Sequence, residues 1–572
     1  MRVIATAGHV DHGKSTLVRR LTGMEPDRWA EERRRGLTID LGFAWTRLGD
    51  EQVAFVDVPG HERFVPNMLA GTGPVPAVAF VVAADEGWMP QSAEHLAALD
   101  AFGVRHGLLV VTKADRADPA AAGEAALAEI AQTSLGRVPA VAVSGVTGEG
   151  LDEVRTALAD LAAGLPVPDP EADVRLWLDR AFTVPGAGTV VTGTLGAGTI
   201  AVGDELRLGD TVVGVRGLHA LGEPRERVSG VARVAVNLRG ISRDAAARGA
   251  TLVQPDAWHV TDVVDVRLPK AAELHREAVL HLGTAAIPVR VRPLGTDTAR
   301  LTLRSPLPLR VADRGLLRDP GERRVAAGIT VLDVDPPALT RRGAAQARAR
   351  DLDAPDPAAV QLRRRGFVRD REFETMGLPR TGERIGGWLA DPGRLAEIRA
   401  EVPERLAAWR RAHPVAAGMP TEELRRGLRL PSAELLPAVL GDLTVSGGVV
   451  SERGAGLDAR TEAALAVLDE QWAQHPFRAP EAEQRRTLGL GKRELAAAAR
   501  LGRVTVIDDG VVLGPDAEDR AVAVLRSIDQ PFTVSSARRA LDSTRRVLVP
   551  LLEHLDAAGH TEPLGDGTRV TT

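Results

Sequence analysis

The sequence predicts a multidomain α/β protein, in which a parallel-sheet domain precedes two small antiparallel β-barrels and a series of helical modules. Three observations predict this order. Residues 1 to about 165 alternate short apolar runs with helical patterns, as a doubly wound parallel sheet does. From about residue 172, apolar residues recur with a period of two between glycine turns, which is typical of antiparallel strands. Beyond residue 340, helical patterns alternate with glycine-bounded β pairs roughly every 55–60 residues, so we expect helix-and-hairpin modules of the winged-helix type.

The domain boundaries follow from these changes of pattern. Residues 166–170 read PVPDP, a stiff linker that ends the first domain. The predicted domains are 1–168 for the parallel sheet, 172–257 and 258–340 for the two barrels, and 345–394, 395–456, 457–515 and 516–572 for four winged-helix modules.

Composition excludes several classes of protein. The 572-residue chain has no cysteine, which excludes disulfides, cysteine-ligated metals and thiol catalysis. The net charge of −5 means that any nucleic-acid contact must come from a local basic cluster. The N-terminus leads directly into a predicted core strand, and the longest apolar run, 75–84, is too short to span a bilayer. We therefore expect a soluble, cytoplasmic protein without a membrane contact.

Residues 8–15 read GHVDHGKS and match the phosphate-loop pattern GxxxxGKS without a mismatch. An apolar run, 3–5, precedes the loop as a predicted strand, and a helix is predicted from Ser15. Such a loop directs backbone N–H groups at phosphates, the helix N-terminus adds positive charge, and Lys14 reaches the terminal phosphates. The predicted phosphate-loop contacts are Gly8, His9, Val10, Asp11, His12, Gly13, Lys14, Ser15 and Thr16.

Three further motifs each follow a predicted strand: DVPG at 57–60, TKAD at 112–115 and SGV at 144–146. Asp57 supplies a carboxylate for Mg²⁺, and Gly60 an N–H for the γ-phosphate. Asp115 can accept both hydrogens that guanine presents and adenine does not. The motifs in this order predict a GTPase with GTP and Mg²⁺ as cofactors. Its further GTP contacts are Asp57, Gly60, Thr112, Lys113, Asp115, Ser144, Gly145 and Val146, and its Mg²⁺ ligands are Ser15, Thr38 and Asp57.

His61 is the predicted catalytic residue. A lone histidine is more often a surface group, but His61 follows Gly60 directly, at the expected position of the γ-phosphate. A His or Gln at that point can orient the attacking water.

The segments GHVDHGKST, RGLTIDLGFAW and DVPGHERFV resemble the translation-factor GTPases, and RGLTID with TKAD resembles the selenocysteine-specific elongation factors in particular. The segment GAGTVVTGTLGAGTIAVGDEL resembles the second-domain barrel of translation factors. This resemblance implies a monomeric factor that carries selenocysteinyl-tRNA to the ribosome at a recoded UGA codon. It also implies that the ribosome stimulates GTP hydrolysis.

The resemblance further implies an aminoacyl pocket formed by Asp179, Arg180, His219 and Arg233. Selenocysteine differs from serine in that its selenol is ionised at neutral pH. An arginine site favours that anion, and a neutral analogue would leave the arginine unpaired, at a cost of roughly 1–3 kcal/mol. The alternative is that Asp179 and Arg180 form an ordinary ion pair on a strand.

The C-terminal segment LDSTRRVLVPLLEHLDAAGHTEPLGDGTRV resembles the terminal winged helix with which selenocysteine factors hold a hairpin of the messenger RNA. We expect Ser543 to cap its helix and 516–572 to fold alone. The predicted contacts to that stem-loop are Arg538, Arg539, Arg545, Arg546 and Arg569. An arginine pair at a helix start is otherwise usually a solvated face.

Two residues depart from the usual GTPase pattern. Thr112 stands where most GTPases have Asn, which we expect to remove one amide link between the base loop and the phosphate loop, and Gly145 stands where Ala is usual. Both predict looser nucleotide binding and exchange without a separate factor. The alternative functions are a carrier of ordinary or initiator tRNA, the GTPase of sulfate activation, and a GTP-gated DNA-binding regulator.

Overall fold

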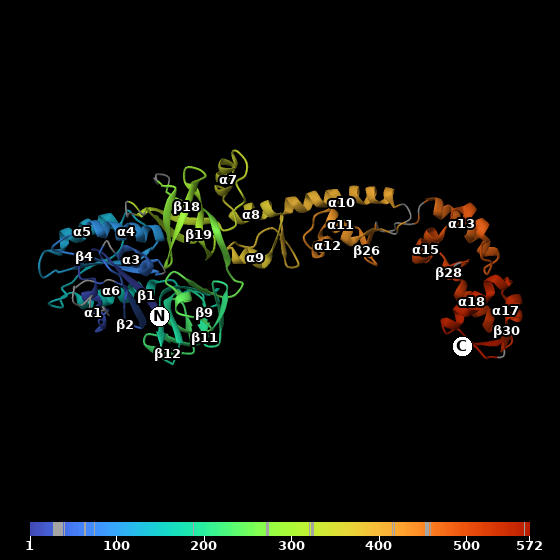
Figure 1. Cartoon of the computed structure of the whole chain (residues 1–572), viewed down its shortest axis with the longest axis horizontal. Helices are drawn as coiled ribbons and strands as arrows, with labels where there is room; N and C mark the ends of the chain where they lie inside the picture. Colours follow the sequence, from blue (N-terminus) through green and yellow to red (C-terminus); the bar gives the residue numbers. More distant parts are fainter. Residues whose placement is uncertain are drawn as a thin grey trace. The chain divides into compact units, whose positions relative to one another are not determined.

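The computed structural model describes all residues except 27–37, 39, 62–63, 74, 187, 270–273, 320, 322–324, 414–415, 417, 452–456, 458, 509 and 566. The chain forms two compact units, 1–381 and 382–572, and each is described by itself (Figure 1). The observed parallel sheet, antiparallel barrels and C-terminal helix-and-hairpin groups confirm the predicted fold class. The boundary between the two units falls inside the predicted module 345–394, so the exact domain limits remain predictions.

The first domain is built on a six-stranded sheet in the order β2-β3-β1-β4-β5-β6. Every neighbouring pair is parallel except β2 and β3. Strands β1 and β4 are buried along their whole length, which explains their continuous apolar sequences. The strands are β1 (Arg2–Ala7), β2 (Gly42–Leu48), β3 (Glu51–Asp57), β4 (Ala77–Ala83), β5 (His106–Thr112) and β6 (Ala140–Ala142).

Helices cover both faces of this sheet. Helices α3, α4 and α5 bury their apolar residues in the core on one face, whereas α1 and α6 form the core on the other. The helices are α1 (Lys14–Thr22), α3 (Val65–Thr72), α4 (Pro90–Phe102), α5 (Pro119–Ile130) and α6 (Leu151–Gly164). Proline in the first turn starts α4 and α5, and a left-handed glycine, Gly103, ends α4. The phosphate loop therefore leads from β1 directly into the start of α1.

The first barrel follows the linker. Strands β10, β15, β7, β8, β14 and β11 form a ring, which the pairing of β10 with β11 closes, and β12 extends β11. One apolar core fills the ring. The elements are β7 (Arg175–Val184), β8 (Gly188–Leu195), β9 (Thr199–Ala201), β10 (Glu205–Leu208), β11 (Thr211–Ala220), β12 (Glu223–Arg225), β13 (Arg227–Ser229), β14 (Ala232–Arg239), η2 (Asp244–Ala246) and β15 (Thr251–Val253).

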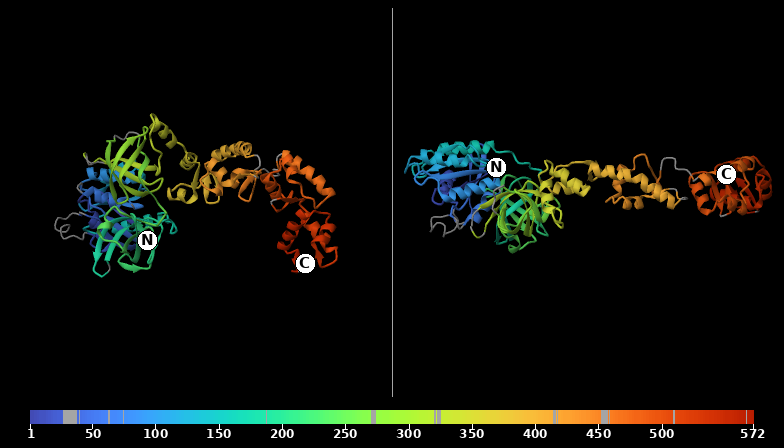
Figure 2. Two further views of the ribbon diagram at one scale, coloured as in Figure 1. Left: turned by 45° about the vertical axis from the view of Figure 1, so that its right-hand side comes forward. Right: turned by 90° about the horizontal axis from the view of Figure 1, so that it is seen from above.

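The second barrel is closed in the order β16-β19-β18-β17-β20-β21, with β21 paired back to β16. Figure 2 gives two further views of both barrels. The strands are β16 (His259–Arg267), β17 (Glu277–Leu282), β18 (Ala285–Pro293), β19 (Thr298–Leu309), β20 (Arg314–Arg318) and β21 (Val325–Asp333).

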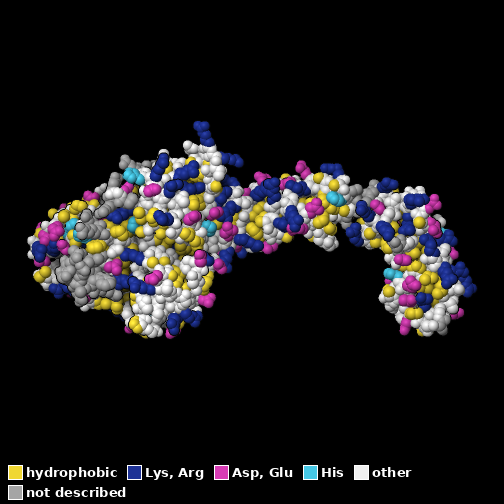
Figure 3. All heavy atoms as spheres, viewed as in Figure 1, with side chains coloured by type: hydrophobic (Ala, Val, Ile, Leu, Met, Phe, Trp, Pro, Cys, Tyr) yellow, Lys and Arg dark blue, Asp and Glu magenta, His cyan; other side chains and the backbone are white. Residues whose placement is uncertain are grey.

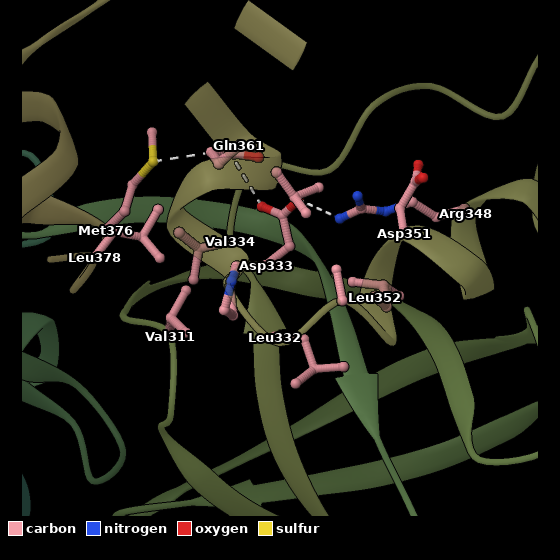
Figure 4. Close-up of a pocket in the computed structure, with 13 residues that line it drawn as sticks. Val311, Leu332, Asp333, Val334, Arg348, Asp351, Leu352, Gln361, Met376 and Leu378 are labelled. Carbon is pink, nitrogen blue, oxygen red and sulfur yellow. Dashed lines mark hydrogen bonds and ion pairs between the residues drawn. The ribbon is translucent and has the colours of Figure 1, made fainter. Parts of the chain in front are cut away.

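A short helical segment belongs to the same unit as the second barrel. It consists of α7 (Ala344–Leu352), α8 (Pro357–Arg365), β22 (Phe367–Arg369) and α9 (Asp370–Thr375). Arg348 of α7 is buried and donates from Nε to Asp265 Oδ2 of the barrel at 2.7 Å. It also pairs with Asp333, to which Gln361 of α8 contributes a hydrogen bond of 3.5 Å (Figure 4). Buried charges thus attach these helices to the barrel.

The second unit repeats a pattern of helices followed by a β-hairpin. The hairpins end at β27, β29 and β32, and acidic and basic side chains are interspersed over the face of this unit that Figure 3 shows. The elements are β23 (Glu383–Ile385), β24 (Trp388–Ala390), α10 (Pro392–Ala412), β25 (Met419–Pro420), α11 (Thr421–Gly427), η3 (Ala433–Leu435), α12 (Leu436–Leu440), β26 (Thr444–Ser446), β27 (Val449–Ser451), α13 (Ala459–Gln474), α14 (Ala482–Leu488), α15 (Lys492–Arg500), β28 (Thr505–Asp508), β29 (Val511–Leu513), α16 (Ala517–Arg526), β30 (Phe532–Thr533), α17 (Val534–Ala540), α18 (Arg545–Ala557), β31 (Thr561–Pro563) and β32 (Thr568–Thr571).

The last two of these groups share a core. Phe477, Ala479, Val511 and Leu513 pack in the same apolar cluster as the buried face of α18. The segment 516–572 is therefore not separated from 457–515 by an independent core. Within the described residues, no helix is both long and apolar enough to cross a membrane.

Candidate functional site

The phosphate loop has a backbone that only glycine accommodates at its first position. Gly8 has φ of +130°, and a Cβ there would lie 2.1 Å from the carbonyl oxygen of Val81. Asp11 and Gly13 also have positive φ, and Gly13 is the N-cap of α1. The loop thus turns tightly between β1 and α1, and Lys14, Ser15 and Thr16 form the first turn of the helix, where N–H groups are free of helical partners.

Lys14 lies inside this loop. Its side chain is buried, and Nζ donates to the carbonyl oxygens of Gly8 at 3.0 Å and His9 at 2.6 Å. Burial lowers the pKa of Lys14 to about 8. A phosphate group at the loop would compensate the charge that burial destabilises.

Ser15, Thr38 and Asp57 meet at the end of the loop. The hydroxyl oxygens of Ser15 and Thr38 lie 2.9 Å apart. Asp57 Oδ1 accepts from Thr6 at 2.7 Å, whereas its Oδ2 is buried and makes no hydrogen bond. Burial raises the pKa of Asp57, although hydrogen bonds from Ser15 and Thr6 and the charge of Lys14 act in the opposite direction. These oxygens fit Mg²⁺, which prefers oxygen ligands. The part of the chain that the structure describes contains no cluster of three or more His, Asp or Glu side chains that could hold a metal ion instead.

Gly60 lies against the phosphate loop. A Cβ there would lie 2.5 Å from Lys14 Nζ and 2.7 Å from the backbone nitrogen of Val10. His61 follows it, and its ring centroid is 5.9 Å from that of Phe64. Residues 62–63 lie outside the described residues, so the catalytic role of His61 stays a prediction.

Two side chains of α4 that the sequence analysis missed bond the loop backbone. Gly8 N donates to His95 Nδ1 at 3.1 Å, and Val10 N donates to Gln91 Oε1 at 3.2 Å. Because Nδ1 accepts, this bond assigns the ring proton of His95 to Nε2. Burial lowers the pKa of His95 well below its usual range. The only signal in the sequence is a Gln and a His four residues apart on one helix.

Burial disfavours the charged form of both loop histidines. His12 is fully buried, and burial lowers its pKa to about 4. Burial, together with Lys14, also lowers the pKa of His9. Their contribution to the loop is therefore shape and polarity, and the positive charge comes from Lys14.

The predicted base-binding residues come together at the ends of β5 and β6. Ser144 Oγ donates to Asp115 Oδ1 at 2.6 Å and accepts from the N–H groups of Val146 at 3.2 Å and Thr147 at 3.0 Å. Lys113 pairs with Glu86 at 2.6 Å. Although partial burial opposes the charge, hydrogen bonds to Glu86 and Asp85 raise the pKa of Lys113. The carboxylate of Asp115 is thus oriented, and Lys113 stays charged.

The loop 144–146 is also tied to α1. Arg20 Nε donates to the carbonyl oxygen of Gly145 at 2.7 Å. A Cβ at Gly145 would lie 3.0 Å from a methyl carbon of Thr16, so the alanine usual at this position would be tightly packed here.

Thr112 lacks the amide of Asn, as expected, but its hydroxyl links the base loop to the phosphate loop instead. Thr112 Oγ1 donates to the carbonyl oxygen of His12 at 2.6 Å. A hydroxyl at the end of β5 therefore replaces the amide link that an Asn would make at this position.

A second candidate site lies between β2 of the first domain and the first barrel. It is a cavity of about 210 Å³. Phe43 and Trp45 of β2 form one wall, and Arg180, His219 and Arg233 of the barrel lie on the other. Three of the four predicted aminoacyl residues thus line one cavity.

Asp179 and Arg180 do not pair with each other, which excludes the alternative interpretation of this strand. Asp179 pairs with both terminal nitrogens of Arg233, the NH2 bond being 2.7 Å, and accepts from Thr192 at 2.7 Å. The guanidinium of Arg233 lies 3.8 Å from the ring centroid of Phe43. Arg180 instead bonds Asp40 at 3.0 Å. The two arginines are therefore held by different carboxylates.

The predicted RNA contacts divide into two groups. Arg538, Arg539 and Arg545 are exposed and make no ion pair with a described residue. Arg569 is mostly buried and pairs with Asp556 at 3.0 Å. Arg546 pairs with Glu481 at 3.1 Å. Only the first group is available to a phosphate backbone without breaking an ion pair.

Ser543 does not cap α18. The N-cap is Thr544, which makes no side-chain cap bond, and Ser543 Oγ donates to the carbonyl oxygen of Phe477 at 2.7 Å. Its hydroxyl joins the two last helix-and-hairpin groups instead.

Family models match three segments of the chain. The model "Elongation factor Tu GTP binding domain" matches residues 1–163. "Selenocysteine-specific elongation factor, beta-barrel domain" matches 261–338, and "Elongation factor SelB, winged helix" matches 523–570.

Curated relatives match over the whole chain. The selenocysteine-specific elongation factor of Escherichia coli (strain K12) is 32% identical, with 99% of this chain and 98% of that protein covered. The factor of the same name from Desulfomicrobium baculatum is 29% identical, with 99% of both chains covered.

Among solved structures, the bacterial selenocysteine-specific elongation factor EF-Sec matches with a TM-score of 0.78, 25% identity and full coverage of both chains. The elongation factor SelB of Methanococcus maripaludis, solved with the GTP analogue GppNHp, shares the fold at a TM-score of 0.52 and 24% identity, covering 59% of this chain and 79% of that one.

Proposed function

The chain belongs to the family of selenocysteine-specific elongation factors, and on that premise we propose that it delivers selenocysteinyl-tRNA to the ribosome at a recoded UGA codon. It is a translation GTPase with a C-terminal winged helix. We further propose that the winged helix holds a stem-loop of the messenger RNA, and that the factor acts as a monomer in the cytoplasm.

The nucleotide side of this proposal rests on the phosphate-loop geometry. Lys14 and the first N–H groups of α1 bind the phosphates, and Asp115, oriented by Ser144, selects guanine. Ser15, Thr38 and Asp57 would hold Mg²⁺, which supplies the positive charge that neutralises the phosphate oxygens during hydrolysis.

His61 orients the attacking water in this proposal, once the ribosome orders its side chain. Its support is the close approach of Gly60 to Val10 and Lys14, which brings the residue before His61 to the phosphate loop. His61→Ala should leave GTP affinity unchanged and lower the ribosome-stimulated rate of hydrolysis by orders of magnitude. A stimulated rate equal to that of the unmutated protein would contradict the role.

The observation that carries the cargo assignment is the cavity lined by Arg180, Arg233 and His219. Arg233 is paired with Asp179, and Arg180 bonds Asp40 through NH2 alone. The remaining donors of Arg180, beside an apolar wall, favour a small ligand that combines a short stem with a negative charge. Selenocysteine is such a ligand at neutral pH, whereas serine is uncharged. Cysteine, with an ordinary thiol pKa of about 8.5, is mostly uncharged.

The test compares one tRNA charged in turn with selenocysteine, cysteine and serine. The GTP form should bind the selenocysteinyl form most tightly, and the cysteinyl form should gain affinity as the pH rises toward the thiol pKa. Arg180→Ala with Arg233→Ala should remove the preference by weakening the selenocysteinyl complex alone. Equal affinity of the unmutated protein for all three charged tRNAs at neutral pH would overturn the proposal.

The RNA tether is supported by the exposed arginines of α17 and α18. Arg538, Arg539 and Arg545 lie at the end of one helix and the start of the next, so they form a local basic cluster on a unit of mixed charge. Such a cluster suits a few phosphates of a hairpin, with sequence read from unpaired bases. Winged helices in other proteins also bind duplex DNA, so the regulator alternative is an outcome of the test described in the Discussion.

A further inference from the structure

Asp40 connects the Mg²⁺ site with the aminoacyl cavity. It lies two residues after Thr38 and two before the start of β2. Its Oδ2 accepts from Arg180 NH2 at 3.0 Å, and its Oδ1 lies 3.7 Å from Arg248 NH1. Both arginines belong to the first barrel segment, so a carboxylate of the nucleotide-binding domain is held between two cations of its neighbour.

The hydrogen bond to Asp40 fixes the NH2 group of Arg180. The same NH2 also donates to the carbonyl oxygen of Leu41 at 3.2 Å. No described residue bonds its Nε or NH1, and the side chain lines the cavity. A guanidinium is planar and carries five N–H donors in a rigid arrangement, so fixing its NH2 group also orients the remaining donors. Asp40 therefore determines how Arg180 is presented to a ligand.

The position of Asp40 depends in turn on the nucleotide site. The hydroxyl oxygens of Thr38 and Ser15 are 2.9 Å apart, beside the unpartnered oxygen of Asp57. Two residues of chain span at most about 7 Å, so a displacement of Thr38 from Ser15 that exceeds this reach must also displace Asp40. Arg248, the second cation on Asp40, also donates to Asn67 of α3 at 2.8 Å, and α3 begins a few residues after Gly60 and His61. Asp40 is thus connected to Thr38 through the chain, and to α3 through Arg248. These two segments flank the expected position of the γ-phosphate.

We propose that Asp40 is a positioning residue that makes the affinity for selenocysteinyl-tRNA depend on the bound nucleotide. With Thr38 at Ser15, Asp40 orients Arg180 toward the cavity, and when Thr38 leaves, Arg180 loses that orientation. This inference rests on the proposed function of the cavity. It assigns the coupling to a charge outside the cavity rather than to a residue that touches the amino acid.

The test uses Asp40→Asn in the full chain. Asparagine keeps the size and an acceptor oxygen but removes the charge. In the GTP form, the affinity for selenocysteinyl-tRNA should fall about tenfold, the usual size of one charge-assisted contact. The affinity of the GDP form, the affinity for seryl-tRNA, and GTP and GDP binding should stay unchanged. A merely structural defect would lower all of these affinities together.

The matched control is Asp50→Asn. Asp50 lies in the same domain, is fully exposed and approaches Arg47 only at 3.9 Å. It should change none of the affinities. A double variant of Asp40→Asn with Arg180→Ala should bind selenocysteinyl-tRNA no more weakly than Arg180→Ala alone, because Asp40 acts through Arg180.

The outcomes separate this inference from the proposed function. If the unmutated protein prefers selenocysteinyl-tRNA but Asp40→Asn binds it equally well in the GTP form, the inference alone is wrong. If Asp40→Asn binds it more tightly, Asp40 competes with the ligand for Arg180, and the inference is also wrong. If the unmutated protein shows no preference among charged tRNAs, the proposed function fails and the inference with it.

Discussion

The hydroxyl of Thr112 donates a 2.6 Å hydrogen bond to the main-chain carbonyl of His12, and so joins the guanine-binding loop to the phosphate loop. Both groups are buried. Because a buried carbonyl without a partner is costly, this single bond fixes the distance between the two loops that must hold opposite ends of one nucleotide. The departure from Asn thus changes which atom makes the link and does not abolish it.

Thr112→Val tests this bond directly. Valine keeps the branched shape but leaves the His12 carbonyl unsatisfied, at a cost of about 1–3 kcal/mol. We expect faster dissociation of both GDP and GTP with the preference for guanine over adenine retained. Stopped-flow dissociation of a fluorescent guanine nucleotide measures the effect. Thr112→Ser keeps the hydroxyl and serves as the control, and equal rates for the Val and Ser variants would contradict the role of the bond.

The second prediction concerns the pH dependence of nucleotide binding. Burial lowers the pKa of Lys14 to about 8 in the nucleotide-free protein, and phosphates favour its charged form. The affinity for GTP should therefore be flat below pH 8 and fall by up to about tenfold per pH unit above it. The folding stability of the nucleotide-free protein changes with pH in the opposite direction to the GTP affinity. Between pH 8 and 10.5, the ordinary pKa of lysine, the unfolded chain keeps a proton that the folded protein lacks, so stability without nucleotide rises with pH.

Titration of GTP binding between pH 7 and pH 9 checks this prediction. Lys14→Arg is the control, because arginine stays charged throughout this range. Any decrease that remains in this variant comes from groups other than Lys14. A wild-type curve parallel to that of Lys14→Arg would show that Lys14 does not titrate here.

Sequence patterns predicted the nucleotide site because its residues have fixed spacing on consecutive strand ends. Gly8, Lys14 and Asp57 each occupy a position that the backbone of the fold requires, and the structure brings them together. Gln91 and His95 could not be predicted in this way. They lie on a helix whose apolar pattern is ordinary, and their bonds to the loop depend on how α4 packs against β1.

Long-range ion pairs were missed for the same reason. Arg546 and Glu481 are 65 residues apart, and only the packing of two helix-and-hairpin groups brings them into contact. Similarly, nothing in the sequence distinguishes Arg348, which is buried, from Arg350, which is exposed on the same helix. Charge alone therefore could not have indicated the buried network around Arg348.

The third prediction uses that pair of arginines. Arg348→Ala leaves the carboxylates of Asp265 and Asp333 without one of their cations, and breaking a buried pair costs about 3–5 kcal/mol. Arg350→Ala removes an exposed side chain from the same helix and should change stability by less than about 0.5 kcal/mol. Because a chain with several domains does not unfold in one step, hydrogen exchange of the second barrel is the appropriate measurement. Equal protection of β16 and β21 in both variants would contradict the network's role in attaching α7.

The last prediction concerns the C-terminal groups and revises the expectation that 516–572 folds alone. Phe477, Ala479, Val511 and Leu513 complete the core under α18, and Ser543 bonds the carbonyl of Phe477. A fragment 457–572 keeps this core whole, whereas 516–572 exposes its apolar surface to water. We expect the longer fragment to unfold cooperatively and the shorter one to lack a cooperative transition. Circular dichroism during thermal unfolding distinguishes the two, and equal transitions would show that the shared core is dispensable.

Neighbouring arginines in this fragment provide the matched test of RNA binding. Arg545 has no ion-pair partner among the described residues, whereas Arg546 pairs with Glu481 and donates to the carbonyl oxygen of Ala479 at 3.3 Å. Arg545→Ala in 457–572 should weaken binding to a selenoprotein stem-loop and reduce the salt dependence by about 0.7–0.9 units of log[salt], the contribution of one phosphate. Arg546→Ala should instead lower the thermal stability and leave the salt slope unchanged, because its charge is already compensated.

In the full chain, Arg545→Ala should reduce read-through of the recoded codon while GTP and charged-tRNA binding persist. If the fragment prefers duplex DNA to every stem-loop tried, the tether is wrong and the DNA-binding regulator becomes the better account of this segment.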